Sequence, residues 1–364
     1  MTVASDAQSR RRVCAISILI PLRGEGRLRN LEKMSPWEAG PWIHPGSGRP
    51  FVAKERTWHY LMTEPADRIN RPDDRFHWVN PALRDFDFID CLELVHAPTD
   101  LSSKAPSAYL IVHTSITPGP KGGITEIFER VTNLYSPRRG STSALLETAE
   151  LASFKPDLQY PRATTVSLVI DAGSLPPFNG DNTMEDAVAF LANLPNTTPL
   201  GQRATSHEIR PIGPRSIMAV SAGGVSLSLT DRRDSLGEMR AFVVDALLIA
   251  TIQRDQLVGF SLEWANKRER KGRSGNSIAD RFDKFRRIWW WAAPLSHQSS
   301  YISLPYEAWQ SATRSQEFMN QLSDEFRDAR NAQQAKATRL LAYMGLGIAV
   351  VSIIVALIVP VVFK

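Results

Sequence analysis

The sequence predicts an α+β (or α/β) domain with a mixed sheet, followed by a helical hairpin, a long stalk helix and one C-terminal transmembrane helix. Three observations predict this order. Apolar, β-branched runs alternate with helical patterns up to residue 234, strand patterns stop there, and residues 340–363 carry no charged side chain. Alternating strands and helices are typical of layers around one sheet, whereas so long an uncharged run is typical of a membrane span.

The first predicted strand lies in the apolar run VCAISILI at residues 13–20, which follows an arginine-rich start. A secretory signal is the alternative interpretation of such a run. No small-residue cleavage site follows it, and Arg23, Arg27 and Arg29 come soon after. A β-branched run in this context favours a buried strand.

Further strands are predicted at 107–116 and 164–171, where apolar residues dominate. The runs at 216–221 and 225–230 flank a Gly-Gly pair and predict a hairpin. Residues 31–100 are rich in Pro, Trp, Arg and Asp, which favours loops packed by aromatic side chains.

Helices are expected at 123–135 and 183–194, between the strands. Ser235 and Glu238 form an S-x-x-E capping box, which predicts the start of a long helix. That helix should end in the basic loop KRERKGRSGN, after which a shorter helix leads to Pro294.

The chain has no Pro or Gly between Pro305 and Gly345, so one continuous helix is predicted from Pro305 into the membrane. Its length to Phe363 would be roughly 88 Å. The predicted parts are therefore an α/β domain at 1–234, a helical hairpin with a basic loop at 235–304, a stalk at 305–339 and a membrane helix at 340–363.

Met319, Leu322 and Phe326 have the three-and-four spacing of a coiled-coil seam, which predicts association between stalks of neighbouring chains. The alternative is an amphipathic helix that lies on its own domain.

Gly345, Ala349, Ser352 and Ala356 form a small-residue stripe along the predicted membrane helix. Such a stripe allows close packing between helices. It is also the only face polar enough to line a passage, since the other faces are Ile, Val or Leu.

Four cations, Arg327, Arg330, Lys336 and Arg339, precede the membrane helix, and only Lys364 follows it. Basic residues collect on the cytoplasmic side of a membrane. We therefore expect a single-pass protein of the cell membrane with its N-terminal domain in the cytoplasm.

A second basic group lies in the predicted loop of the hairpin: Lys267, Arg268, Arg270, Lys271 and Arg273. This group is a candidate anion contact, for lipid phosphates or a nucleic acid. A solvated tip is the alternative interpretation, and the mild net charge of +5 makes nucleic acid the less expected partner.

No catalytic pattern is found, so an enzyme is not expected. The histidines form no H-x-x-x-H or H-E-x-x-H pair, and HTSITPGPKGG lacks the Walker spacing. The two cysteines, Cys14 and Cys91, are far apart and indicate reduced thiols. No cofactor is evident.

Four stretches carry a resemblance to the CorA-type divalent-cation transporters over about residues 235–363: FVVDALLIATIQRDQLVGF, DRFDKFRRIWWW, the helix from Pro305, and GIAVVSIIVALIVPVVF with its late Pro360. The resemblance implies a cytoplasmic α/β domain, a stalk helix that runs into the first span, a pentamer around a pore, and Mg²⁺ or another divalent cation as the ion. The family's Gly-Met-Asn motif does not occur in this sequence, so no ion-selecting residue is carried over.

Two functions are therefore expected. The first is a CorA-like oligomeric membrane protein, either a degenerate cation channel or a ligand sensor with a cytoplasmic regulatory domain. The alternative is a tail-anchored scaffold or effector that recruits a cytoplasmic protein partner, for example in a bacterial defence or envelope system.

Overall fold

The structure is a computed structural model. It describes these residues: 14–24, 37–39, 75–78, 89–97, 101–116, 141–149, 151, 153–156, 164–170, 188–189, 191–192, 208–213, 216–229, 236–269, 275–288, 290 and 300–362.

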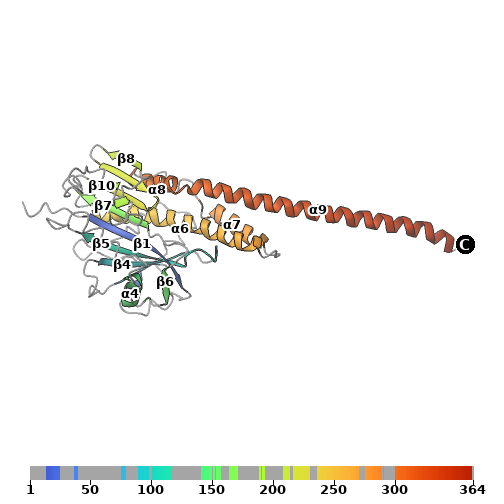
Figure 1. Ribbon diagram of the computed structural model, residues 1–364, viewed down its shortest axis with the longest axis horizontal. Coiled ribbons are helices and arrows are strands. Elements are labelled where there is room, and N and C mark those ends of the chain that lie inside the picture. The colour runs from blue at the N-terminus through green and yellow to red at the C-terminus, as the bar shows by residue number, and fades with distance from the viewer. Residues whose placement is uncertain are drawn as a thin grey trace, which may run out of the picture.

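A mixed sheet dominates the N-terminal part, as the sequence predicts (Figure 1). Within the described ranges it has ten strands, in the order β2-β3-β4-β5-β1-β7-β10-β9-β8, with β6 paired to β1. All of these pairs are antiparallel except β7 with β10, which is parallel. The strands are β1 (Cys14–Gly24), β2 (Trp37–Ala39), β3 (Arg75–Trp78), β4 (Ile89–His96), β5 (Ala108–Ile116), β6 (Phe154–Pro156), β7 (Thr164–Ile170), β8 (Glu208–Gly213), β9 (Ser216–Ser221) and β10 (Gly224–Leu229).

The predicted N-terminal strand is confirmed as β1, which lies in the middle of the sheet between β5 and β7. Ala15 and Leu19 join the core that the sheet shares with the helices, and the intervening Ile16 and Ile18 are fully buried as well. A strand buried on both faces reads as a nearly continuous apolar run, which explains the pattern in the sequence.

The strands predicted at 107–116 and 164–171 are confirmed as β5 and β7, and the predicted hairpin is confirmed as β9–β10. The expectation of loops throughout 31–100 is wrong, because β2, β3 and β4 lie there. β4 is buried from Cys91 to Val95 and pairs along its length with β5, and this pairing overrides the local Pro- and Arg-rich composition. The helix predicted at 123–135 lies outside the described residues, and of 183–194 only 188–189 and 191–192 are described, as helix.

Five helices have bounds in the described part: α4 (Ser141–Thr148), α6 (Leu236–Glu269), α7 (Gly275–Ile288), α8 (Ser300–Ala312) and α9 (Ser315–Val362). α6 packs against β1 and β7, and α8 packs against β8, β9 and β10. One hydrophobic core joins Leu227 of the sheet, Phe260 of α6 and Trp309 of α8. The hydrophobic core is therefore continuous across the predicted boundary at residue 234. The predicted capping residue Ser235 lies outside the described residues.

The prediction of one continuous helix from Pro305 is wrong. Pro305 lies inside α8, which ends at Ala312, and α9 begins at Ser315. Arg314 has a positive φ of 51°, a left-handed conformation that no α-helix contains. The Thr313 hydroxyl donates to the Trp309 carbonyl oxygen at 2.9 Å and lies 2.7 Å from the Ser315 hydroxyl, so this side chain supports the end of α8 and the start of α9.

Candidate functional site

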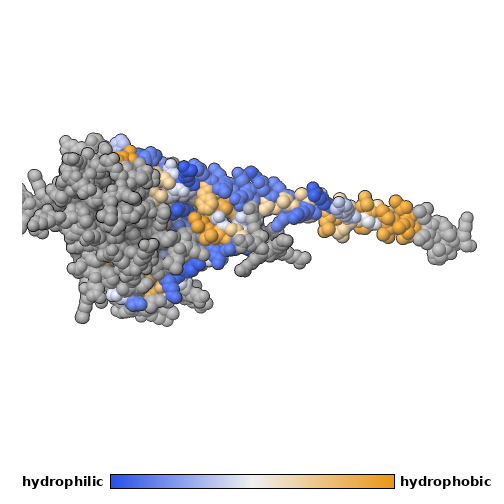
Figure 2. All heavy atoms as spheres, in the orientation of Figure 1, coloured by the Kyte–Doolittle hydropathy of each residue, from blue (hydrophilic) through white to orange (hydrophobic). Residues whose placement is uncertain are grey.

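α9 carries the main candidate site, a long apolar surface that nothing in the chain covers. Every side chain described from residue 331 to residue 355 is exposed. By length and composition, α9 is the one helix among the described residues that is long and apolar enough to cross a membrane. Figure 2 shows hydrophobic side chains gathered along α9 beyond the polar stalk. The exposed large apolar residues are Leu340, Leu341, Tyr343, Met344, Leu346, Ile348, Val350, Val351, Ile353, Ile354 and Val355.

The small-residue stripe is part of this exposed surface. Gly345, Ala349 and Ser352 are exposed, and a Cβ on Gly345 would meet no atom within 4 Å. Ala356 belongs to α9, but its side chain lies outside the described part. The stripe is therefore open in the single chain, and its use for packing or for a passage stays a prediction.

The stalk seam of Met319, Leu322 and Phe326 requires a correction. These three side chains are buried within the chain itself, at 2–3% exposure. Phe326 contacts Trp264 of α6 and Phe282 of α7, with ring centroids 4.8 and 4.7 Å away. The amphipathic alternative is therefore what the structure shows, because α6 and α7 already cover the apolar stripe that heptad spacing assigned to a second chain.

The basic flank divides into two parts. Arg330 forms an ion pair with Asp280 of α7 at 2.8 Å and another with Asp283. Arg327 pairs with Asp324 of its own helix at 2.6 Å. Lys336 and Arg339 lie further along α9, in its fully exposed stretch. Arg330 thus joins α9 to α7, and the two later cations lie next to the apolar surface.

The candidate anion contact is described only in part. Lys267 and Arg268 belong to the last turn of α6, and nothing is described of their side chains. Arg270, Lys271 and Arg273 lie outside the described residues.

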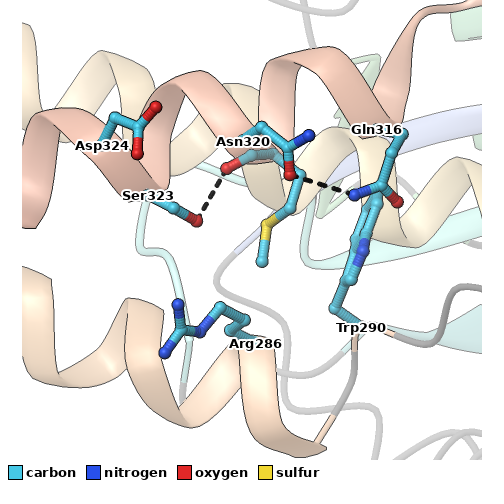
Figure 3. Close-up of a pocket in the computed structure, with 7 residues that line it drawn as sticks. Arg286, Trp290, Gln316, Asn320, Ser323 and Asp324 are labelled. Atoms are coloured by element: carbon cyan, nitrogen blue, oxygen red, sulfur yellow. Dashed lines mark hydrogen bonds between the residues drawn. The ribbon is translucent and has the colours of Figure 1, made fainter.

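A groove between α7 and α9 was not expected from the sequence. It has a volume of about 390 Å³ and is lined by Arg286, Trp290, Gln316, Met319, Asn320, Ser323 and Asp324 (Figure 3). The Gln316 amide donates to the Asn320 side-chain oxygen at 3.1 Å on the exposed side of α9, so the α9 wall of the groove is polar there. The side chains that line the groove include the guanidinium of Arg286, the carboxylate of Asp324 and neutral polar groups, beside the apolar Trp290 and Met319. Among the described residues, no three His, Cys, Asp or Glu side chains gather as metal ligands.

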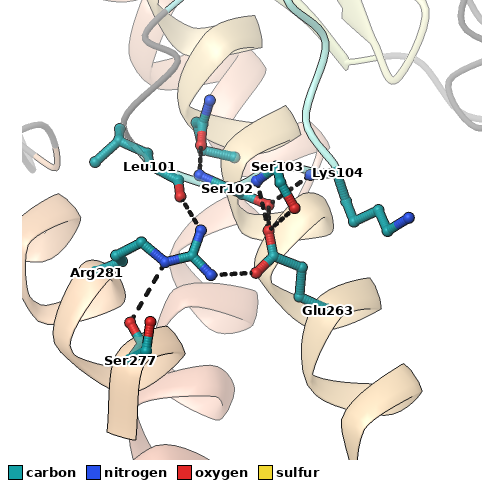
Figure 4. A network of polar contacts seen from close by, with 8 residues as sticks. Leu101, Ser102, Ser103, Lys104, Glu263, Ser277 and Arg281 are labelled. Atoms are coloured by element: carbon teal, nitrogen blue, oxygen red, sulfur yellow. Dashed lines mark hydrogen bonds and ion pairs between the residues drawn. The ribbon is translucent and has the colours of Figure 1, made fainter. Parts of the chain in front are cut away.

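A polar network fastens the loop between β4 and β5 to the helices (Figure 4). One oxygen of Glu263 accepts hydrogen bonds from the Ser102 hydroxyl at 2.8 Å and from the Ser103 amide at 2.5 Å and hydroxyl at 3.0 Å. The other oxygen pairs with Arg281 at 2.5 Å, and Arg281 also donates to the Leu101 carbonyl oxygen. A single carboxylate of α6 thereby connects a loop of the sheet to α7.

The electrostatics of Glu263 follow from these contacts. Burial alone would raise the pKa of its carboxyl, but hydrogen bonds from Arg281, Ser102 and Ser103 and the charge of Arg281 outweigh burial, so the pKa lies below its usual value. The loop can approach so closely because Gly259 has no side chain. A Cβ at that position would lie 2.5 Å from the Ser102 hydroxyl oxygen and 2.8 Å from the Ala105 nitrogen.

A second buried network crosses three adjacent strands. The Ser17 hydroxyl lies 2.9 Å from Nδ1 of His113, whose Nε2 lies 2.9 Å from a carboxylate oxygen of Glu93. This order of groups is that of a nucleophile, a base and an orienting acid. All three residues are fully buried, however, so no substrate reaches the hydroxyl in this structure. Sequence reasoning missed the network because its members lie 96 and 20 residues apart; only the register that pairs Ser17 with His113 reveals it.

All the large apolar side chains described as exposed belong to α9, whereas the polar networks of Glu263 and His113 are enclosed. Among the described residues, the exposed apolar surface is therefore that of α9, in a stretch long and apolar enough to cross a membrane. In comparisons with protein families, curated proteins and solved structures, no match to this chain was found.

Proposed function

We propose that this protein is a membrane-anchored binding protein, in which α9 crosses the bilayer and holds the α+β domain at the cytoplasmic surface. The observation that carries this proposal is the exposure of every described large apolar side chain from Leu340 to Val355. Each side chain of this kind is stabilised by about 1.5–3 kcal/mol when it leaves water. A bilayer supplies an apolar surrounding along the whole length of a helix.

The dimensions of α9 support this role. The helix from Leu340 to Val362 extends about 34 Å, at 1.5 Å per residue, and the hydrocarbon core is about 30 Å thick. Lys336 and Arg339 then lie at the headgroups of one leaflet. Because cations are retained on the cytoplasmic side, the α+β domain lies in the cytoplasm.

Binding is favoured over catalysis because the polar constellations of the described residues serve to join elements. Glu263 fastens a loop, Arg330 fastens α9, and the Ser17–His113–Glu93 network lies inside the sheet. The groove between α7 and α9 is open to a cytoplasmic ligand or protein segment. A partner bound there contacts the first turns of the same helix that enters the membrane.

A second candidate is the CorA-like oligomer, and the open stripe of Gly345, Ala349 and Ser352 is the observation that favours it. Small residues allow helices to approach closely within a bilayer. Since α6 and α7 cover the stalk seam, association in this candidate takes place through the membrane helix. Ion flux through liposomes that contain the purified protein distinguishes a conducting oligomer from an anchored binding protein.

The anchoring is tested by alkaline carbonate extraction of membranes from cells that express the full chain. The triple variant Ile348→Asp, Val351→Asp and Ile354→Asp should be released, because each central charge disfavours insertion by about 2.5–3.5 kcal/mol. The control variant Asn331→Asp, Gln333→Asp and Gln334→Asp places the same charges in the exposed stalk and should stay in the membrane. A wild-type chain that carbonate releases would contradict the proposal.

A further inference from the structure

The groove between α7 and α9 is closed at the end that lies toward the apolar part of α9. At that end Arg330 of α9 pairs with Asp280 and Asp283 of α7. The rings of Phe326 and Phe282 also lie 4.7 Å apart there, measured between centroids. The groove begins beyond these contacts, nearer the start of α9. The contacts at the closed end therefore hold the two walls in place before any ligand binds, which lowers the cost of ordering them.

The shape of the groove suits a protein segment. On α9 the lining side chains extend from Gln316 to Asp324, about 12 Å at 1.5 Å per residue. Gln316, Asn320 and Asp324 are all exposed, so the groove is open to solvent along its length (Figure 3). A pocket for a small molecule encloses most of its ligand, whereas a peptide lies in an open groove between helices. The length fits about four residues of an extended chain or about two helical turns.

The floor of the groove is apolar and is held by the hydrophobic core. Met319 is a buried member of that core, and Trp290 packs against the core while its side chain stays partly exposed. The Trp290 amide donates to the Phe285 carbonyl oxygen at 3.1 Å, and the two rings lie 6.1 Å apart between centroids. These contacts place the indole just beyond the end of α7. A well-packed Trp at a surface is the kind of side chain that contributes most of the affinity at protein interfaces.

The α7 wall of the groove is cationic. Arg286 is exposed, and within the described part of the chain it has no hydrogen bond or ion pair. Asp324 on the opposite wall is already paired with Arg327 at 2.6 Å. The nearest acid of α7, Asp283, is paired with Arg330. Of the two charged side chains that line the groove, the guanidinium is therefore the one left for a ligand, and its N–H groups match a carboxylate.

The α9 wall adds neutral donors to this charge. The Asn320 side-chain oxygen accepts from the Gln316 amide at 3.1 Å, which leaves the two N–H groups of Asn320 for a ligand. The Ser323 hydroxyl donates to the Met319 carbonyl oxygen at 2.8 Å. Donors of Arg286 and Asn320 thus lie on facing walls of one groove, above an apolar floor.

We propose that this groove binds an acidic segment of a partner protein, in which an Asp or Glu lies next to a large apolar side chain. The carboxylate accepts from Arg286 and from the Asn320 amide, and the apolar side chain lies against Trp290 and Met319. The inference rests on the proposed binding function and names the chemistry of its partner. Charge complementarity selects an acidic segment, since a basic one would repel Arg286 and a neutral one would leave it unpaired.

The test begins with displayed random peptides, selected on the immobilised full chain in detergent, with empty micelles as the subtraction. The selected peptides should be enriched in Asp and Glu beside Leu, Ile, Met, Phe or Trp. A selected peptide is then labelled with fluorescein and titrated by fluorescence anisotropy. Arg286→Gln should weaken its binding about tenfold or more, because a charge-assisted hydrogen bond is lost. The matched control Arg287→Gln is exposed beside Arg286 but does not line the groove, and it should change the affinity by about twofold or less.

Two further variants test the charge and the space of the groove. Arg286→Glu should reject the selected peptide and gain affinity for the same peptide with Lys in place of its acid. Asn320→Trp should fill the groove and abolish binding. Gln321→Trp, at an exposed position of α9 outside the groove, should bind as the wild type does. Because all these positions are exposed, circular dichroism of the variants should match that of the wild type.

The remaining outcomes overturn the inference. If no peptide is enriched, or if Arg286→Gln and Asn320→Trp bind as the wild type does, the groove is not a docking site. Enrichment of basic peptides would assign it a partner of the opposite charge. A smaller particle by light scattering for Asn320→Trp would show that the groove holds a second copy of this chain. Carbonate extraction decides the anchoring separately, since peptide binding in detergent does not depend on a bilayer.

Discussion

Phe326 of α9 places its ring 4.7 Å from the ring of Phe282 of α7, measured between centroids. This contact decides what the apolar stripe of the stalk does. Heptad spacing of apolar residues indicates only that one face of a helix packs against a partner, and it does not say whether the partner belongs to the same chain. Here the cover comes from α6 and α7 of the same chain, and Arg330 continues the attachment through its ion pairs with Asp280 and Asp283.

The variant Phe326→Ala should lower the free energy of unfolding by about 3–5 kcal/mol, because it leaves a cavity between three helices. Gln321→Ala, at an exposed position of the same helix, should change it by about 0.5 kcal/mol or less. Urea titration of the detergent-solubilised protein, followed by tryptophan fluorescence, measures both. If Phe326→Ala instead reduced the particle size measured by light scattering and left the free energy of unfolding unchanged, Phe326 would pack between neighbouring chains.

Gly259→Ala and Gly345→Ala should have opposite effects on stability. Alanine favours a helix by about 1 kcal/mol over glycine, but at Gly259 its Cβ would lie 2.5 Å from the Ser102 hydroxyl oxygen. Overpacking of about 1–3 kcal/mol then exceeds the propensity gain. A Cβ at Gly345 meets no atom within 4 Å, so that variant should unfold no more easily than the wild type. Urea titration measures both effects. A Gly259→Ala variant that is more stable than the wild type would show that the loop between β4 and β5 is not packed against α6.

Glu263→Gln should destabilise the protein by about 1–3 kcal/mol at pH 7, because the carboxylate accepts from Arg281, Ser102 and Ser103. Its folded-state pKa lies below the ordinary value of 4.5, so the charged form contributes stability above pH 4.5. That contribution is lost as the pH falls through the lowered pKa. The stability gap between wild type and Glu263→Gln should therefore narrow in acid, whereas the exposed Glu317→Gln should show no such gap. A gap independent of pH would contradict this assignment.

Arg314→Gly should stabilise the junction between α8 and α9. A left-handed conformation disfavours a residue with a Cβ by about 1–2 kcal/mol, while the extra backbone entropy of glycine costs about 0.5–1 kcal/mol. The expected net gain is about 0.5–1 kcal/mol. Ala312→Gly, at the last residue of α8, should lower the free energy of unfolding by up to about 1 kcal/mol. Thermal unfolding of the two variants should shift in opposite directions, and equal shifts would count against a left-handed Arg314.

His113→Ala should destabilise the sheet, since Ser17 and Glu93 each lose a hydrogen bond at a position without solvent access. The expected loss is about 1–3 kcal/mol for each group. Ser17→Ala removes only the hydrogen bond to His113 and should lower the free energy of unfolding by less than His113→Ala does. A fluorophosphonate probe should leave Ser17 unlabelled in the native protein; labelling of Ser17 would reveal a state in which the network is accessible.

The strands β1 and β5 were predictable from the sequence because most of their described side chains are buried, and burial on both faces leaves a dense apolar run. The hairpin of β9 and β10 was predictable because its two runs flank a Gly-Gly pair. The membrane-length apolar helix was predictable for a related reason, since its composition alone distinguishes it from any polar helix. The strands β2, β3 and β4 were not, because strands in a region rich in Pro and Arg are stabilised by pairing with partners distant in the sequence.

By itself the sequence determined where apolar surface occurs along the chain and how long each apolar run is. Only the tertiary structure decided what covers each surface. Phe326 is covered by α6 and α7, and the side chains from Leu340 to Val355 are covered by nothing in the chain, although both segments are parts of one helix. The Glu263 and His113 networks likewise depend on register and loop placement. The physical reason is that periodicity is a property of neighbouring residues, whereas a partner at a contact distance of a few ångströms is brought there by the fold as a whole.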